Sequence, residues 1–83
     1  MSKKEKLVVR LKSKPNDFTF DEAKTLMESF GYIMSNSGKT SGSRVRFVRN
    51  KKVFFMHKPH PRKELPAYQI KEIIAELKQE DLL

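Results

Sequence analysis

The sequence predicts an α+β fold in which helices pack against a three-stranded antiparallel sheet. Apolar residues recur at helical spacing toward both ends of the chain, whereas they alternate with polar residues in the middle. Clusters of Ser, Gly, Asn and Pro separate these segments and mark turns. The expected order is α-α-β-β-β-α. Because 83 residues suffice for one small domain only, residues 1–83 are expected to form a single domain.

The first helix is expected close to the N-terminus. Leu7, Val8 and Leu11 lie at helical spacing, and the Ser-Lys-Pro-Asn-Asp sequence at 13–17 is a turn signal that ends the helix. Residues 1–14 are therefore expected to form a helical extension ahead of the rest of the domain.

A capping box opens the second helix, since Thr19 is followed three residues later by Glu22. Gly31 is a natural C-terminal stop, so this helix is expected from about Phe20 to Phe30. Its apolar face is formed by Ala23, Leu26, Met27 and Phe30.

Strand-like alternation begins at Tyr32. Residues 32–35 form the first expected strand, and residues 43–48 form the second, after a Ser/Gly/Thr loop. In the second strand, Val45 and Phe47 fall on the side that would face the helices. The opposite side carries Arg44, Arg46 and Val48.

The third strand is apolar on both faces. It follows a hairpin turn at Asn50-Lys51 and places Val53, Phe55 and His57 on one face and Phe54, Met56 and Lys58 on the other. One face can pack on the helices. The other needs a cover, which could be the first helix, a second copy of the chain or a different protein.

Prolines mark the end of the sheet and the start of the last helix. Pro59 and Pro61 end the third strand because each fixes its own φ and favours extended geometry in the residue before it. Pro66 is well placed at the opening of a helix. The apolar stripe of this helix is Ile70, Ile73, Ile74 and Leu77.

The positive charge is concentrated in the middle of the chain. Residues 29–63 contain nine lysines and arginines, both histidines and no acidic residue. The net charges of the two flanking segments nearly cancel each other, so the middle accounts for the net charge of +8. Such a field attracts polyanions, of which nucleic-acid backbones are the commonest in a cell. We therefore expect an RNA-binding surface here; the alternative is a solvated basic surface without a dedicated ligand.

Several classes of protein are disfavoured by what the sequence lacks. It has no cysteine for disulfides or thiolate metal sites, and no apolar stretch long enough for a signal peptide or a membrane span. We expect a cytoplasmic protein that makes no membrane contact. Gly38-Lys39-Thr40 resembles the end of a nucleotide-binding P-loop, but the first glycine of that motif is missing, so no cofactor is expected.

His57 and His60 are the residues suited to proton transfer, because imidazole ordinarily titrates near neutrality. Cleavage of RNA by its own 2′-hydroxyl needs a base, an acid and cations on the phosphate oxygens. Alternatively, either histidine donates a hydrogen bond to backbone near the proline turn. A metal site is not expected, because no acid or cysteine lies nearby and the neighbouring cations would repel the ion.

Phosphate contacts are expected from Lys39 in the loop, from Arg44 and Arg46 on one strand face, and from Lys58 beside the histidines. Such contacts depend on charge and shape rather than on base identity. A sheet that reads RNA sequence normally exposes stacking aromatics, and Phe54 is the only convenient candidate for that role.

Short motifs in a fixed order resemble the HicA toxin family. They are Gly31-Tyr32 after a helix, the sequence Gly-Ser-Arg-Val-Arg-Phe at 42–47, and His-Lys-Pro-His-Pro-Arg-Lys-Glu-Leu at 57–65 ahead of Ile73-Ile74. The likeness spans about Phe20 to Leu83. It implies a HicA-like core at 18–83 with a fold like the double-stranded-RNA-binding domain. It also implies a small bacterial endoribonuclease that cleaves mRNA and whose HicB antitoxin covers the active surface.

One position departs from that family. Many HicA proteins have a catalytic histidine after Gly-Ser, whereas this chain has Gly42-Ser43-Arg44. A guanidinium can clamp phosphate or stabilise a transition state but cannot act as a general base. Base duty would pass to His57 on the neighbouring strand or to His60, which matches the family's histidine before the last helix. We therefore expect Arg44, His57 and His60 as catalytic residues of a metal-independent nuclease, with RNA contacts by Lys39, Ser43, Arg44, Arg46 and Lys58. A non-catalytic RNA-binding module or a protein-interaction subunit are the alternatives.

Overall fold

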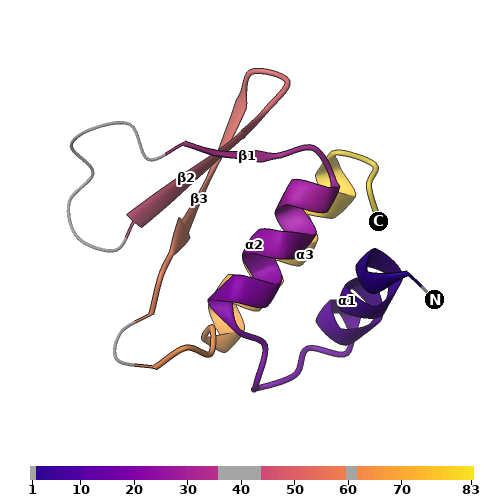
Figure 1. Cartoon of the computed structure of the whole chain (residues 1–83), viewed down its shortest axis with the longest axis vertical. Helices are drawn as coiled ribbons and strands as arrows, with labels where there is room; N and C mark the ends of the chain where they lie inside the picture. Colours follow the sequence, from indigo (N-terminus) through magenta and orange to yellow (C-terminus); the bar gives the residue numbers. More distant parts are fainter. Residues whose placement is uncertain (1, 36–43, 60–61) are drawn as a thin grey trace.

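The computed structural model describes residues 2–35, 44–59 and 62–83 of the protein. The element order is α-α-β-β-β-α, as the sequence predicts (Figure 1). The elements are α1 (Lys3–Lys12), α2 (Phe20–Ser29), β1 (Ile33–Ser35), β2 (Arg44–Arg49), β3 (Lys52–His57) and α3 (Ala67–Gln79). The fold class is thus α+β. The succession from α2 to α3 matches the double-stranded-RNA-binding-domain-like fold that the family resemblance implies.

The three strands form one antiparallel sheet in the order β1-β2-β3. The β2–β3 hairpin turns at Asn50 and Lys51, whose φ values of 49° and 69° are those of a type I′ turn. Lys51 takes the position that usually holds glycine, so the predicted turn forms without one. The register then pairs Val48 with Val53 near the turn and Arg44 with His57 at the other end.

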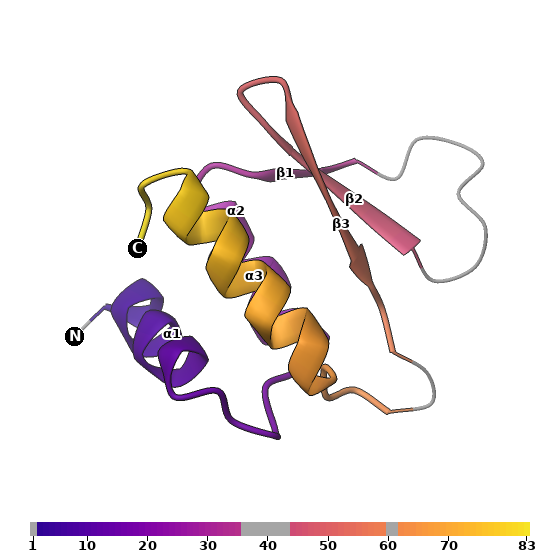
Figure 2. The same ribbon diagram turned by 180° about the vertical axis from the view of Figure 1, so that it is seen from behind.

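The helices lie in two layers on one side of the sheet. α2 and α3 lie against the sheet, and α1 packs on the far side of this helix pair (Figures 1 and 2). The first helix therefore does not cover the outer face of the sheet. Of the three covers that the sequence leaves open, α1 is excluded, and the outer face is left to solvent or to a partner.

The core lies between the sheet and the helices. Val45, Phe47 and Met56 point inward, and Leu7 and Leu11 of α1 belong to the same buried cluster. The predicted stripe of α3 is buried throughout, with the four residues Ile70, Ile73, Ile74 and Leu77.

Phe54 packs partly buried against this cluster, whereas Phe55 is on the outer face and 38% exposed. The expectation that Phe54 is the aromatic residue on the basic face is therefore wrong. The register explains the difference, because Phe54 pairs with the buried Phe47 while Phe55 pairs with Arg46.

Glu22 connects the first two helices. Its carboxylate accepts a hydrogen bond from the Thr19 N–H at 3.0 Å, and its own N–H donates to Thr19 Oγ1 at 3.2 Å, which confirms the predicted capping box. The same carboxylate accepts from Arg10 Nε at 3.0 Å. This hydrogen bond raises the pKa of Arg10. One side chain thus caps α2 and holds α1 against it.

The linker between α1 and α2 forms backbone hydrogen bonds with the linker between β3 and α3. The N–H of Leu65 donates to the carbonyl of Phe18 at 2.8 Å, and the N–H of Phe20 donates to the carbonyl of Lys63 at 3.0 Å. These bonds fix the C-terminal end of the segment that joins β3 to α3. Among the described residues, no helix is both long enough and apolar enough to cross a membrane.

Candidate nucleic-acid interface

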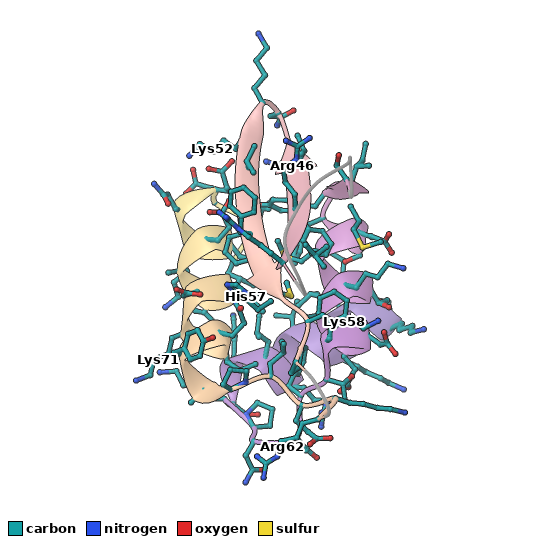
Figure 3. All side chains as sticks on the ribbon, turned by 90° about the vertical axis from the view of Figure 1, so that its left-hand side faces the viewer. Arg46, Lys52, His57, Lys58, Arg62 and Lys71 are labelled. Atoms are coloured by element: carbon teal, nitrogen blue, oxygen red, sulfur yellow. The ribbon has the colours of Figure 1, made fainter. Side chains whose placement is uncertain are left out.

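The cross-strand register brings Arg44 and His57 together at the end of the hairpin away from its turn. We call Arg44, His57 and the following Lys58 the open end. Residues directly opposite each other in an antiparallel pair share one face of the sheet, with Cβ atoms about 5 Å apart. All three open-end residues are exposed. In Figure 3, His57 and Lys58 lie where β3 leaves the sheet, below Arg46 and Lys52.

Arg44 is held over an aromatic ring. Its guanidinium carbon lies 3.8 Å from the centroid of the Phe55 ring, which is within the range of a cation–π contact. Phe55 is two residues before His57 on β3, so both side chains lie on the outer face. The outer face at this end of the hairpin thus carries a guanidinium, an aromatic ring and an imidazole.

Arg46 is also on this face but is tied into the sheet. Its Nη2 donates to Ser35 Oγ at 3.1 Å, which joins β2 to β1. Part of its donor capacity therefore supports the sheet. Its predicted contact with phosphate stays a prediction.

Gln69 of α3 fixes the end of β3. Its side chain is fully buried, and its Oε1 accepts a hydrogen bond from the backbone N–H of His57 at 3.1 Å. Its Nε2 donates to Glu72 Oε1 at 3.0 Å. Gln69 is absent from the residues that the sequence predicts for the site. The signal that could have found it is its spacing, since position 69 precedes Ile73 by four residues and so falls on the buried stripe.

Lys58 lies over the start of α2. Its Nζ is 5.8 Å from the centroid of the Phe20 ring. Within the described residues, neither Lys58 nor Arg44 nor His57 forms an ion pair. Among the described residues, therefore, no carboxylate neutralises the positive charge of the open end.

The cations at the hairpin turn are arranged differently. Lys52 Nζ lies 2.7 Å from Glu80 Oε2, and Arg49 Nη1 lies 3.5 Å from Glu80 Oε1. The hydrogen bond to Glu80 raises the pKa of Lys52. Arg49 Nε also donates to the carbonyl of Phe30 at 3.0 Å. These cations fasten the turn to the ends of α2 and α3.

Three predicted site residues, Lys39, Ser43 and His60, lie outside the described residues, so their roles stay predictions from sequence. In the remainder of the chain, no three His, Asp or Glu side chains come together as they would to hold a metal ion. The structure thus brings together Arg44 and His57 of the predicted set on the outer face, whereas Lys58 follows on the helix side, toward Phe20.

Comparison with known proteins identifies a family. A family model described as the HicA toxin of bacterial toxin–antitoxin systems matches residues 20–81. The matched segment contains the whole sheet, α2, α3 and the open end, and leaves α1 outside. No curated protein and no solved structure matches the chain.

Proposed function

Because the chain belongs to the HicA toxin family of bacterial toxin–antitoxin systems, we propose that it is an endoribonuclease that binds and cleaves mRNA. The observation that carries the proposal is the open end, where Arg44 faces His57 across the hairpin and Lys58 follows. An imidazole among cations that the fold does not neutralise suits a phosphodiester substrate. The bacterial cytoplasm, where mRNA is found, is the proposed site of action.

The proposed reaction is attack by the RNA's own 2′-hydroxyl. A base removes the 2′-hydroxyl proton as the oxygen bonds to phosphorus. An acid donates a proton to the 5′-oxygen as its bond to phosphorus breaks, which leaves a 2′,3′-cyclic phosphate and a 5′-hydroxyl. We assign the proton transfers to His57 and His60. Arg44 would stabilise the charge that builds on the non-bridging oxygens, because its guanidinium stays protonated.

Substrate binding would rest mainly on the RNA backbone. Arg44 and Lys58 are exposed and form no ion pair within the described residues. Cations of this kind contact phosphate oxygens and give binding that weakens steeply with salt. The proposed RNA contacts are Lys39, Ser43, Arg44, Arg46 and Lys58.

The proposed protein partner is a HicB-like antitoxin that covers the outer face of the sheet. Ile33, Val53 and Phe55 are 70%, 47% and 38% exposed on this face, and α1 lies on the opposite side of the helices. Apolar residues beside cations fit a partner that contributes carboxylates and apolar side chains.

A non-catalytic RNA-binding protein is the second candidate, and Arg44 is the observation that favours it. Arg44 stands where many family members have a histidine, and its guanidinium cannot accept a proton. Under this alternative the protein binds RNA at the open end and leaves it intact.

The test is incubation of purified protein with end-labelled single-stranded RNA in EDTA, with His57→Ala and His60→Ala beside the wild type. We expect cleavage by the wild type, cyclic-phosphate ends and loss of cleavage in both variants. Lys12→Ala, an exposed cation on α1, is the matched control and should cleave normally. Intact RNA with every protein, despite binding, would favour the second candidate. Cleavage indifferent to both histidines would contradict their assignment.

A further inference from the structure

We propose that Arg44 and Phe55 form a stacking platform for one unpaired base, so that this site binds single-stranded RNA in preference to duplex RNA. The inference rests on the proposed function in taking RNA as the ligand. It does not depend on cleavage.

The first support is the geometry of the pair. The guanidinium of Arg44 lies 3.8 Å from the centroid of the Phe55 ring, and both residues are exposed. RNA bases stack on aromatic rings and on guanidinium planes alike. A base can therefore add a layer to this stack or replace the guanidinium on the ring.

The second support comes from the other cation–aromatic contacts of the described residues. Their rings are buried or partly buried and belong to Phe18, Phe20, Phe30 and Tyr32. Those contacts lie over rings that the core already holds. Phe55 alone among these rings is exposed, at 38%. Its ring contributes less to the core and more to the surface that a ligand would meet.

The third support is the position of the pair relative to the proposed chemistry. His57 is directly opposite Arg44 and two residues after Phe55 on the same face. A base on the platform would hold its own ribose and phosphate near His57. The stack would thus set which nucleotide presents its 2′-hydroxyl.

The charge of the face agrees with this ligand. No acidic residue occurs among the described outward-pointing residues of the sheet, which are Ile33, Ser35, Arg44, Arg46, Val48, Val53, Phe55 and His57. Cations next to an exposed aromatic ring are the combination that binds unpaired nucleic acid. In a duplex the flat faces of the bases are already stacked on their neighbours, so only the backbone would remain for contact.

Phe55→Trp provides a direct test, because the chain contains no tryptophan and the new indole would be a unique fluorophore. The ligand is a single-stranded RNA with 2′-O-methyl riboses, which cannot be cleaved by the proposed route. We expect this strand to quench the indole emission of the variant strongly, and a blunt duplex of the same sequence to quench it weakly. Val53→Trp, two residues nearer the turn on the same face, is the matched control and should respond less.

Affinity provides the second measurement. Phe55→Leu should weaken single-strand binding about 5- to 150-fold, the equivalent of about 1–3 kcal/mol for a lost base stack. Phe55→Tyr should retain the wild-type affinity, and both variants should keep the wild-type melting temperature to within a few degrees. The slope of affinity against salt should stay unchanged in Phe55→Leu, because the ring contacts no phosphate.

Equal quenching by single strand and duplex, or unchanged affinity in Phe55→Leu, would overturn the platform. Loss of antitoxin binding alone in Phe55→Leu, with RNA binding intact, would also overturn it and would assign the ring to the protein partner. The wild type could also cleave no RNA while the single strand still quenches the Phe55→Trp indole more strongly than the duplex does. In that case the nuclease proposal fails and the platform stands.

Discussion

The two ends of the β2–β3 hairpin differ in what their cations do. At the turn, Lys52 and Arg49 both reach Glu80, and Arg49 also donates to the carbonyl of Phe30. At the open end, Arg44 lies on Phe55 and forms no ion pair within the described residues. The same two strands thus hold one set of cations that fastens the fold and another that is available to a ligand.

This difference refines what the charge distribution of the sequence implies. The acid-free middle of the chain suggests one continuous basic surface. Some of its cations are nevertheless neutralised by carboxylates from other parts of the chain, as Arg49 and Lys52 are by Glu80. A count of basic residues therefore overstates the charge that is available to RNA. The neutralised cations should affect stability, whereas those of the open end should affect binding and cleavage.

The largest expected difference between the two ends is in cleavage. His57→Ala should lower the rate of RNA cleavage about 10²- to 10⁴-fold, the usual contribution of a general acid or base. Lys52→Ala at the turn should leave the rate unchanged. Single-turnover rates on one labelled RNA would measure both, and a comparable loss in Lys52→Ala would remove the distinction between the ends.

A change in the shared core should weaken both ends together. Leu11 of α1 is fully buried against the helix pair, so Leu11→Ala should lower the free energy of unfolding by about 2–5 kcal/mol. We propose on this ground that α1 folds as part of one domain with residues 18–83. Urea unfolding monitored by circular dichroism would measure the loss. Val9→Ala, at a 56% exposed position of the same helix, is the control and should change stability little.

Gln69 separates the support of the open end from its chemistry. Gln69→Met keeps the side-chain volume but removes the acceptor for the His57 N–H, which should cost about 1–3 kcal/mol of stability. Hydrogen exchange at the His57 amide should become faster, while exchange near the turn stays slow. Unchanged protection at His57 would show that this hydrogen bond does not hold the strand end.

The smallest effect concerns pH at the turn end. Burial, followed by the hydrogen bond that Tyr32 Oη donates to Glu76 at 2.8 Å, raises the pKa of Tyr32 above its ordinary value of 10.0. The folded protein therefore keeps this proton after the unfolded chain has lost it. The resulting stability is present below about pH 10 and is lost as the pH rises further. Tyr32→Phe should make this alkaline decline in stability shallower, and equal declines in the two proteins would contradict the assignment.

The elements themselves could be predicted because each had a local signal. The Thr19–Glu22 capping box, the turn at Asn50 and the stripe of α3 are set by neighbours in sequence, and all three are observed. The turn also fixes the observed pairing of Arg44 with His57, which was not among the predictions.

The missed features depend on contacts between distant segments. Gln69 reaches His57 from another element, and Glu80 reaches Arg49 and Lys52 from beyond α3. No local sequence pattern indicates contacts between segments that lie so far apart in the chain. The aromatic residue on the basic face was misassigned for a related reason, since Phe54 and Phe55 are chemically alike and only the register decides which one points outward.

The most direct test of the difference between the two ends is the salt dependence of RNA binding in Arg44→Gln and Arg49→Gln. Arg44→Gln should weaken binding, reduce the slope of log affinity against log salt by about 1 and leave the melting temperature unchanged. Arg49→Gln should keep the wild-type affinity and the wild-type salt slope, and it should lower the melting temperature. A salt slope equal to that of the wild type in Arg44→Gln, or an equal reduction of the salt slope in both variants, would contradict the account.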